Sequence, residues 1–86
     1  MAEKQKIGEV FTYFANIGVA GIKLTDGSLA VGDRILIKGH TTNFEQNVTS
    51  IQIERDNIDK AGVGQEVGIK MNERVRPHDT VYKLVE

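Results

Sequence analysis

Cysteine and tryptophan are absent from this sequence of 86 residues, and proline occurs once. Without cysteine the chain forms no disulfide and offers neither a thiolate nucleophile nor a sulfur ligand for a metal. A small secreted fold stapled by disulfides is thereby excluded, and we expect a cytoplasmic location. The start of the chain, Met1 to Lys6, is polar and no long apolar run follows, so we expect no signal peptide and no membrane span.

Catalytic and nucleotide-binding signatures are also lacking. The two histidines, His40 and His78, are far apart, and they match neither a catalytic triad nor a metal-ligand spacing. No glycine-rich phosphate loop of the Gly-x-x-x-x-Gly-Lys type occurs. We therefore expect a protein that is not an enzyme, needs no cofactor and binds no nucleoside triphosphate.

A single charge sign does not dominate either. Lys and Arg number 11 against 12 Asp and Glu, giving a net charge of −1. No overall positive field holds the chain on nucleic acid, so any RNA contact needs a local patch. With 40% hydrophobic and 27% charged residues the chain is typical of one soluble folded domain. We expect a polar arm at residues 1–6 and one domain at residues 7–86.

The sequence does contain the patterns that are typical of β-strands. β-branched residues and apolar–polar alternation predict six strands, and no window shows an apolar stripe at helical spacing. Residues 56–64 are predicted to be a loop with one turn of helix near 58–61. The predicted strands lie near residues 7–14, 17–24, 35–37, 44–54, 65–71 and 79–85.

The faces of these strands can also be predicted. Ile35 and Ile37 share a parity, as side chains that face a core should. In the other strands alternation groups side chains by face: Ala20, Ile22 and Leu24 against Ile17, Val19 and Gly21, then Thr49, Ile51 and Ile53 against Val48, Ser50 and Gln52, and Val67 with Ile69. Six short strands have too much free edge for an open sheet. The expected fold is therefore all-β, a small six-stranded closed barrel of the Greek-key type.

A glycine turn followed by an alternating strand recurs along the chain. Residues 30–38 and 62–70 both have this pattern, and Pro77 to Val81 repeats it loosely. The stretch Leu29 to Ile37, with its Val-Gly-Asp turn, resembles domain two of translational GTPases such as elongation factor Tu and initiation factor two. The resemblance implies a translation-protein barrel over most of the chain.

A closer resemblance is to the small C-terminal barrel of the collagenase-like peptidase family. It rests on Val10–Phe14, Ile17–Ala20, Ile37–Thr42, Ser50–Glu54 and Val67–Lys70. Some members of that family act in hydroxylating tRNA or ribosomal RNA. Because the catalytic domain of the family is missing from this sequence, the resemblance implies the fold and an accessory contact with RNA or with a partner, and no peptidase or hydroxylase activity.

The first candidate site is the polar stretch before Phe44. Lys38, His40, Thr41 and Thr42 combine a cation, an imidazole and hydroxyls, which suit phosphate contacts beside an aromatic stacking face. The alternative is structural, since threonines are common in turns and Phe44 fits a core position.

The second candidate is Arg74 with Arg76. Two residues apart in an extended stretch, they point the same way and can clamp a phosphate or carboxylate. The alternative is ordinary surface charge. Tyr13, Phe14 and Tyr82 are interpreted as barrel core or rim rather than as stacking platforms.

Two functions remain open. The first is a non-catalytic module that contacts RNA or a ribonucleoprotein, with tRNA or ribosomal RNA as the partner. The second is a protein-interaction module, an accessory subunit of an RNA-modifying or peptidase-like enzyme. An exposed apolar patch or an unpaired edge strand is the expected mark of the second.

Overall fold

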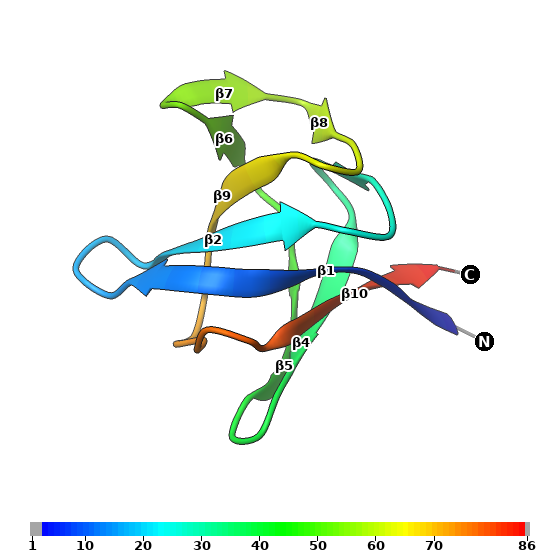
Figure 1. Ribbon diagram of the computed structural model, residues 1–86, viewed down its shortest axis with the longest axis vertical. Coiled ribbons are helices and arrows are strands. Elements are labelled where there is room, and N and C mark those ends of the chain that lie inside the picture. The colour runs from blue at the N-terminus through cyan, green and yellow to red at the C-terminus, as the bar shows by residue number, and fades with distance from the viewer. Residues whose placement is uncertain (1–2, 86) are drawn as a thin grey trace.

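A computed structural model describes residues 3–85, and in that range the secondary structure consists of strands (Figure 1). The all-β prediction is confirmed. No helical segment of the described range reaches the length and hydropathy of a membrane span. The strands are β1 (Glu3–Phe14), β2 (Val19–Leu24), β3 (Leu29–Ala30), β4 (Arg34–Lys38), β5 (Asn43–Asn47), β6 (Ile51–Ile53), β7 (Asp56–Ile58), β8 (Lys60–Ala61), β9 (Glu66–Lys70) and β10 (Thr80–Val85).

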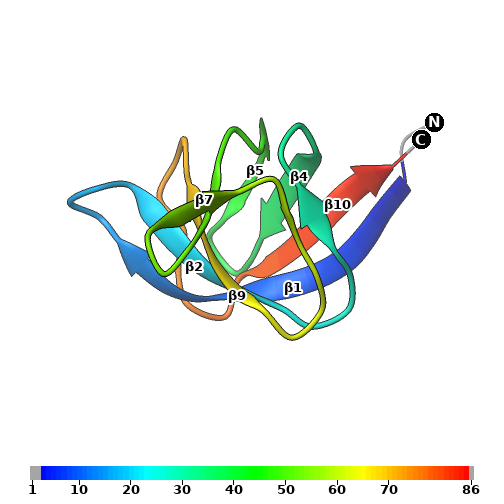
Figure 2. The same cartoon turned by 90° about the horizontal axis from the view of Figure 1, so that it is seen from above.

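The main sheet curls strongly but does not close (Figure 2). Eight strands follow the order β5-β4-β10-β1-β2-β9-β6-β7, and β3 pairs with β8 in a separate two-stranded sheet. The two ends of the order, β5 and β7, are not hydrogen-bonded to each other as strands. The expected closed barrel of six strands is therefore corrected to an open barrel with more and shorter strands.

The break between β5 and β6 explains part of this difference. The predicted strand 44–54 is two strands, because the backbone of Val48 turns toward the loop between β3 and β4. Its N–H donates to the Asp33 carbonyl at 2.8 Å, and its own carbonyl accepts from the Gly32 N–H at 2.9 Å. These bonds replace the ladder that a continuous strand would have made.

Two further predictions need correction. Glu3–Lys6 of the expected polar arm belong to β1 and pair with β10, where the Lys4 ammonium lies 4.9 Å from the centre of the Tyr82 ring. Met1 and Ala2 lie outside the described residues. Residues 56–64 contain strands β7 and β8 in place of the expected turn of helix, because Ile58 packs on the core and pairs with Ile51.

The predicted grouping by face is confirmed for β2, β4 and β9, where Ala20, Ile22, Leu24, Ile35, Ile37, Val67 and Ile69 are at most 2% exposed. It fails for Thr49, which is exposed whereas Ile51 is buried, because Thr49 lies between β5 and β6 and not in a strand. Ile7, Val10, Leu29, Val48, Ile51, Ala61, Met71, Val75 and Val81 complete the core.

Three turns that lead into strands share one geometry, which confirms the recurring turn pattern seen in the sequence. They are residues 30–33, 62–65 and 76–79. In each, the fourth residue donates its N–H to the first carbonyl, and its side-chain oxygen accepts from the first N–H at 2.7–2.9 Å. The third residue has positive φ: Gly32 (98°), Gly64 (94°) and His78 (77°).

Candidate functional site

A β-bulge in β1 turns Phe11 to the outside of the sheet. Phe11 is the unpaired residue between Val10 and Thr12, which lie opposite consecutive residues of β2. Val10 is buried in the core, whereas Phe11 and Phe14 are 46% and 50% exposed. The bulge thus places two aromatic side chains on one outer face.

The floor beside these rings consists of glycine. Gly21 of β2 pairs with Gly68 of β9. A Cβ added to Gly21 would lie 2.8 Å from Phe11 Cζ and 2.7 Å from Thr12 Cγ2, and one added to Gly68 would lie 3.3 Å from Val19 Cγ1. Phe11 and Thr12 therefore cover Gly21, which is buried, and the hollow lies over Gly68 beside the Phe11 ring.

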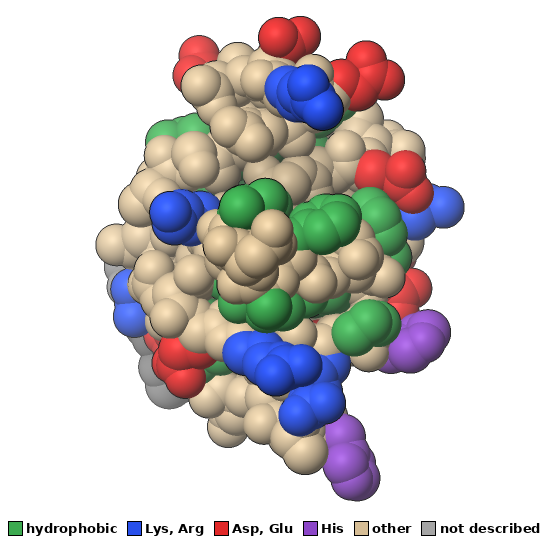
Figure 3. All heavy atoms as spheres, turned by 90° about the vertical axis from the view of Figure 1, so that its left-hand side faces the viewer, with side chains coloured by type: hydrophobic (Ala, Val, Ile, Leu, Met, Phe, Trp, Pro, Cys, Tyr) green, Lys and Arg blue, Asp and Glu red, His purple; other side chains and the backbone are tan. Residues whose placement is uncertain are grey.

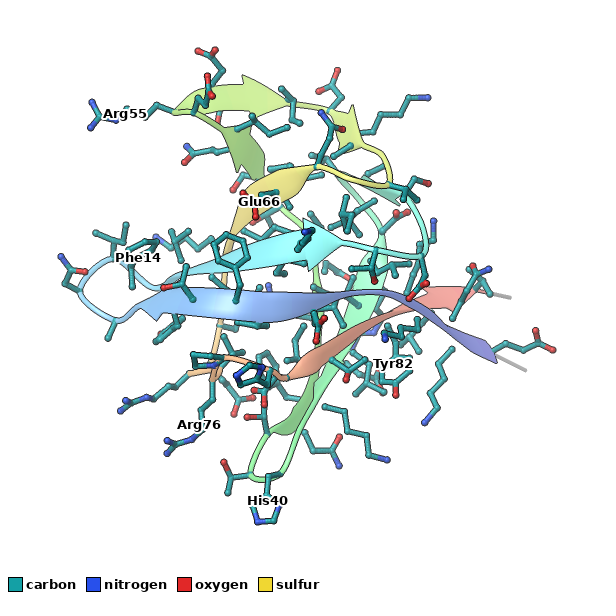
Figure 4. The ribbon with its side chains drawn as sticks, in the orientation of Figure 1. Phe14, His40, Arg55, Glu66, Arg76 and Tyr82 are labelled. Carbon is teal, nitrogen blue, oxygen red and sulfur yellow. The ribbon has the colours of Figure 1, made fainter. Side chains whose placement is uncertain are left out.

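The opposite wall comes from the hairpin of β6 and β7. Gln52 lies opposite Gly68, and the two-residue turn at Glu54 and Arg55 adds its side chains to the rim. Both turn residues have positive φ, 49° and 73°, a conformation that hairpins usually give to Asn and Gly. Figure 4 shows Arg55 extending outward from this turn. We call the resulting hollow of about 260 Å³ the outer groove.

A second hollow of about 380 Å³ adjoins the outer groove. Glu54 and Glu66 line both hollows, whereas Arg55 lines only the first and Lys23 only the second. Within residues 3–85 neither carboxylate takes part in an ion pair. The junction of the two hollows thus has two carboxylates without a salt-bridge partner in that range, and Lys23 lies opposite Glu66 in the pairing of β2 with β9. We call this place the acidic junction.

Further apolar surface lies beside the outer groove. Ile17, in the turn between β1 and β2, is 56% exposed. In Figure 3 hydrophobic side chains gather in the middle of this face, and Lys and Arg side chains lie directly below them. The exposed apolar patch that would mark a protein-interaction module is thus present.

The predicted polar loop lies between β4 and β5. Lys38, His40 and Thr41 are exposed, but Thr42 is only 6% exposed. The carbonyl of Thr42 accepts the Gly39 N–H at 2.8 Å, which closes the loop. Thr42 is thus part of the folded turn, and its side chain is not available to a large partner.

The predicted arginine pair lies between β9 and β10. Arg74 and Arg76 are exposed and the intervening Val75 is 1% exposed, so both arginines face away from the core as their spacing predicts. Within the described part of the chain, neither forms an ion pair. Their charges are free to meet an anion.

The fold brings the two predicted segments to one end of the barrel. Lys38 pairs with Thr80, and Gly39 lies against the Asp79 carboxylate so closely that an added Cβ would collide with it. Figure 4 shows His40 and Arg76 at this same end. We call the exposed set the basic end: Lys38, His40, Thr41, Arg74 and Arg76.

Sequence reasoning missed the outer groove. Phe14 was expected in the core or rim, and it stands half exposed; Tyr13 and Phe44 do pack against the core. The available signal was two phenylalanines three residues apart in a strand, since strict alternation cannot put both on one face. The bulge at Phe11 resolves that conflict.

Nothing in residues 3–85 gathers three or more metal-ligating side chains. The side chains of His40 and His78 also form no hydrogen bond to another described residue. The site therefore consists of an apolar groove with an acidic junction and, at another place, an end rich in cations.

Comparison with known proteins gives relatives named as peptidases. The chain is 38% identical over 83 residues to a collagenase of Porphyromonas gingivalis, covering 95% of this chain and 23% of that protein. It is 42% identical over 84 residues to an uncharacterized protease of Methanocaldococcus jannaschii, covering 96% of this chain and 20% of that protein. The chain thus spans about a fifth of the length of these relatives. No family model matches the chain.

A solved structure shares the fold. It is the C-terminal domain of a protein of Geobacillus thermoleovorans that is assigned to the U32 peptidases. The TM-score is 0.85 at 24% identity, and the match covers 92% of this chain and 91% of that domain. The likeness to collagenase-like proteins expected from the sequence is therefore supported by sequence and by fold. The likeness to domain two of translation factors is not shown by these comparisons.

Proposed function

We propose that the chain is a non-catalytic docking module, an accessory domain or subunit of a peptidase-like protein. The observation that carries this proposal is the match of almost the whole chain to one fifth of proteins named collagenase or protease. In those relatives the equivalent segment is joined to a much longer chain. This chain supplies the same barrel, and we expect it to contact a region that resembles the remainder of such a protein, whether in the same chain or in another.

The outer groove supports the proposal as the place of contact. Phe11, Phe14 and Ile17 are each about half exposed. Removing apolar side chains of this size from water lowers the free energy, so a complex with a partner that covers them would be stabilised. A contiguous apolar face of this kind marks a surface that another protein covers. The lack of positioned histidines supports a binding role over a catalytic one.

Recovery of the tagged protein from its native cells, at low and high salt and with and without ribonuclease, tests this function. We expect a partner, identified by mass spectrometry, whose sequence aligns with the remaining four fifths of the collagenase relatives. Its recovery should resist salt and ribonuclease, because an apolar interface responds weakly to ionic strength. Phe14→Ala should reduce recovery at least tenfold.

The control is Val63→Ala, which removes an apolar side chain that is 62% exposed and lies in a turn outside the outer groove. It should leave recovery unchanged. Absence of any peptidase-like partner under all four conditions would overturn the proposal.

A second candidate function is contact with RNA, and the basic end favours it. Lys38 and Arg76 come from separate segments that the Gly39–Asp79 contact holds together, and their charges lie on one end of the barrel. Cations converging in this way can follow a phosphate backbone. Recovery of tRNA or ribosomal RNA that is lost with salt and with ribonuclease would select this function.

A further inference from the structure

The dimensions of the outer groove point to a single large side chain as its occupant. Pockets that enclose a small-molecule substrate usually have volumes of about 300–1,000 Å³. The outer groove, at about 260 Å³, is smaller and open along one side. Phe11 and Thr12 cover Gly21, but Gly68 has no side chain, so a bulky group can approach the backbone of β9 closely.

The walls of the outer groove select the chemistry of that side chain. Phe11 overhangs the floor from one direction, and Phe14 and Val19 line the same hollow. Aromatic rings prefer offset or edge-to-face contact with another ring. An aromatic or large aliphatic side chain laid on the glycine floor meets these walls.

The acidic junction selects the neighbouring residue. Glu54 and Glu66 line both hollows, while Arg55 and Lys23 line one hollow each. A cation at the junction therefore faces two carboxylates that have no ion-pair partner in residues 3–85. An anion placed there would be repelled by both. In Figure 4 Glu66 lies over the sheet beside β2, and Arg55 points away from it.

We propose that the outer groove binds an extended segment of a partner protein in which a large apolar side chain is followed by Lys or Arg. The apolar side chain lies on Gly68 beside the Phe11 ring, and the cation lies between Glu54 and Glu66. This inference rests on the proposed docking function and gives the chemistry of the segment that is recognised.

The test uses nuclear magnetic resonance titration of the whole chain with three hexapeptides. They have blocked ends, differ only at their two central positions, and carry Phe-Lys, Phe-Glu or Ser-Lys there. We expect the Phe-Lys peptide to shift the amide signals of Gly21, Gly68 and Glu54. The other two peptides should bind at least tenfold more weakly.

Two variants make the test specific. Gly68→Val fills the floor, where an added Cβ already meets Val19, and should abolish the shifts. The matched control is Gly62→Ala, because its Cβ would meet nothing within 4 Å and its φ is not positive, and it should leave binding unchanged. The double change Glu54→Lys and Glu66→Lys should reverse the preference, so that Phe-Glu binds better than Phe-Lys.

Equal binding of the Phe-Lys and Phe-Glu peptides, or full binding by a folded Gly68→Val protein, would overturn the inference. The docking function itself would survive that result if a peptidase-like partner is still recovered from cells. Recovery of no such partner removes the docking function, whatever the peptides do.

Discussion

Gln46 and Lys70 are joined by a hydrogen bond across the place where the barrel fails to close. Gln46 Nε2 donates to the Lys70 carbonyl, and its Oε1 accepts from the Asn72 N–H, each at 2.8 Å. Gln46 belongs to the edge strand β5 and is 3% exposed, while Lys70 ends β9. One buried amide thus provides two bonds at a seam where no strand ladder forms.

Replacing Gln46 tests how much this amide contributes. Gln46→Ala leaves the Lys70 carbonyl and the Asn72 N–H without a partner in a partly buried place, so we expect a loss of about 1–3 kcal/mol in the free energy of unfolding. Urea denaturation measures it. Gln52→Ala is the control, because the exposed side chain of Gln52 bonds, among residues 3–85, to Asn57 alone, and the change should alter stability by no more than about 0.5 kcal/mol. Equal losses of stability in the two variants would show that the buried position of the Gln46 amide does not determine its contribution.

The three equivalent turns allow one hydrogen bond to be compared in three environments. Asp79 is 4% exposed, Asp33 is half-buried and Gln65 is exposed, yet each accepts from the backbone at the start of its turn. Substitution by Ala should cost about 1–3 kcal/mol for Asp79, about 1 kcal/mol for Asp33 and less than about 0.5 kcal/mol for Gln65. Thermal unfolding monitored by circular dichroism gives the order, and any other order contradicts the role of burial.

Much of the fold follows from local pattern. Ile35, Ile37, Val67 and Ile69 share a parity within their strands, and strand geometry then sends them to one face. The direction of Arg74 and Arg76 followed in the same way from their spacing. Predictions of this kind need no knowledge of which strands become neighbours.

The rest depends on contacts between distant segments. The outer groove exists because Gly21 lies opposite Gly68 and because the bulge leaves Phe11 unpaired. Neither fact can be inferred from the sequence of one strand alone. The burial of Thr42 and the contact of Gly39 with Asp79 likewise arise from the packing of one loop on another. Register and strand order therefore limit what the sequence alone predicts about the site.

A substitution in the turn between β6 and β7 should make the folded protein more stable. Glu54 and Arg55 both have positive φ, which costs non-glycine residues of order 1 kcal/mol each, whereas Asn-Gly suits a two-residue hairpin. Changing the pair to Asn-Gly should raise the free energy of unfolding by about 1 kcal/mol in urea denaturation. It should also weaken binding of the Phe-Lys peptide, because it removes Glu54 from the acidic junction.

The control for this prediction is a substitution that should lower the free energy of unfolding. Gly64 has a φ of 94° and open space around its Cα, so Gly64→Ala should cost about 1–2 kcal/mol from backbone conformation alone. If the Asn-Gly variant were less stable than the parent chain, the side chains of the natural turn would have to contribute more than their conformation costs.

The basic end gives the prediction that separates the two candidate functions. Arg74→Ala with Arg76→Ala removes two cations from exposed positions, so stability should change by no more than about 0.5 kcal/mol. If the protein binds tRNA there, loss of two phosphate contacts should reduce the slope of log affinity against log salt by about 1.4–1.8, as measured by filter binding over a salt series. Lys23→Ala with Lys60→Ala makes the same change in net charge on β2 and β8. An equal effect of the two double variants would mean that RNA responds only to net charge and that the basic end is not a site.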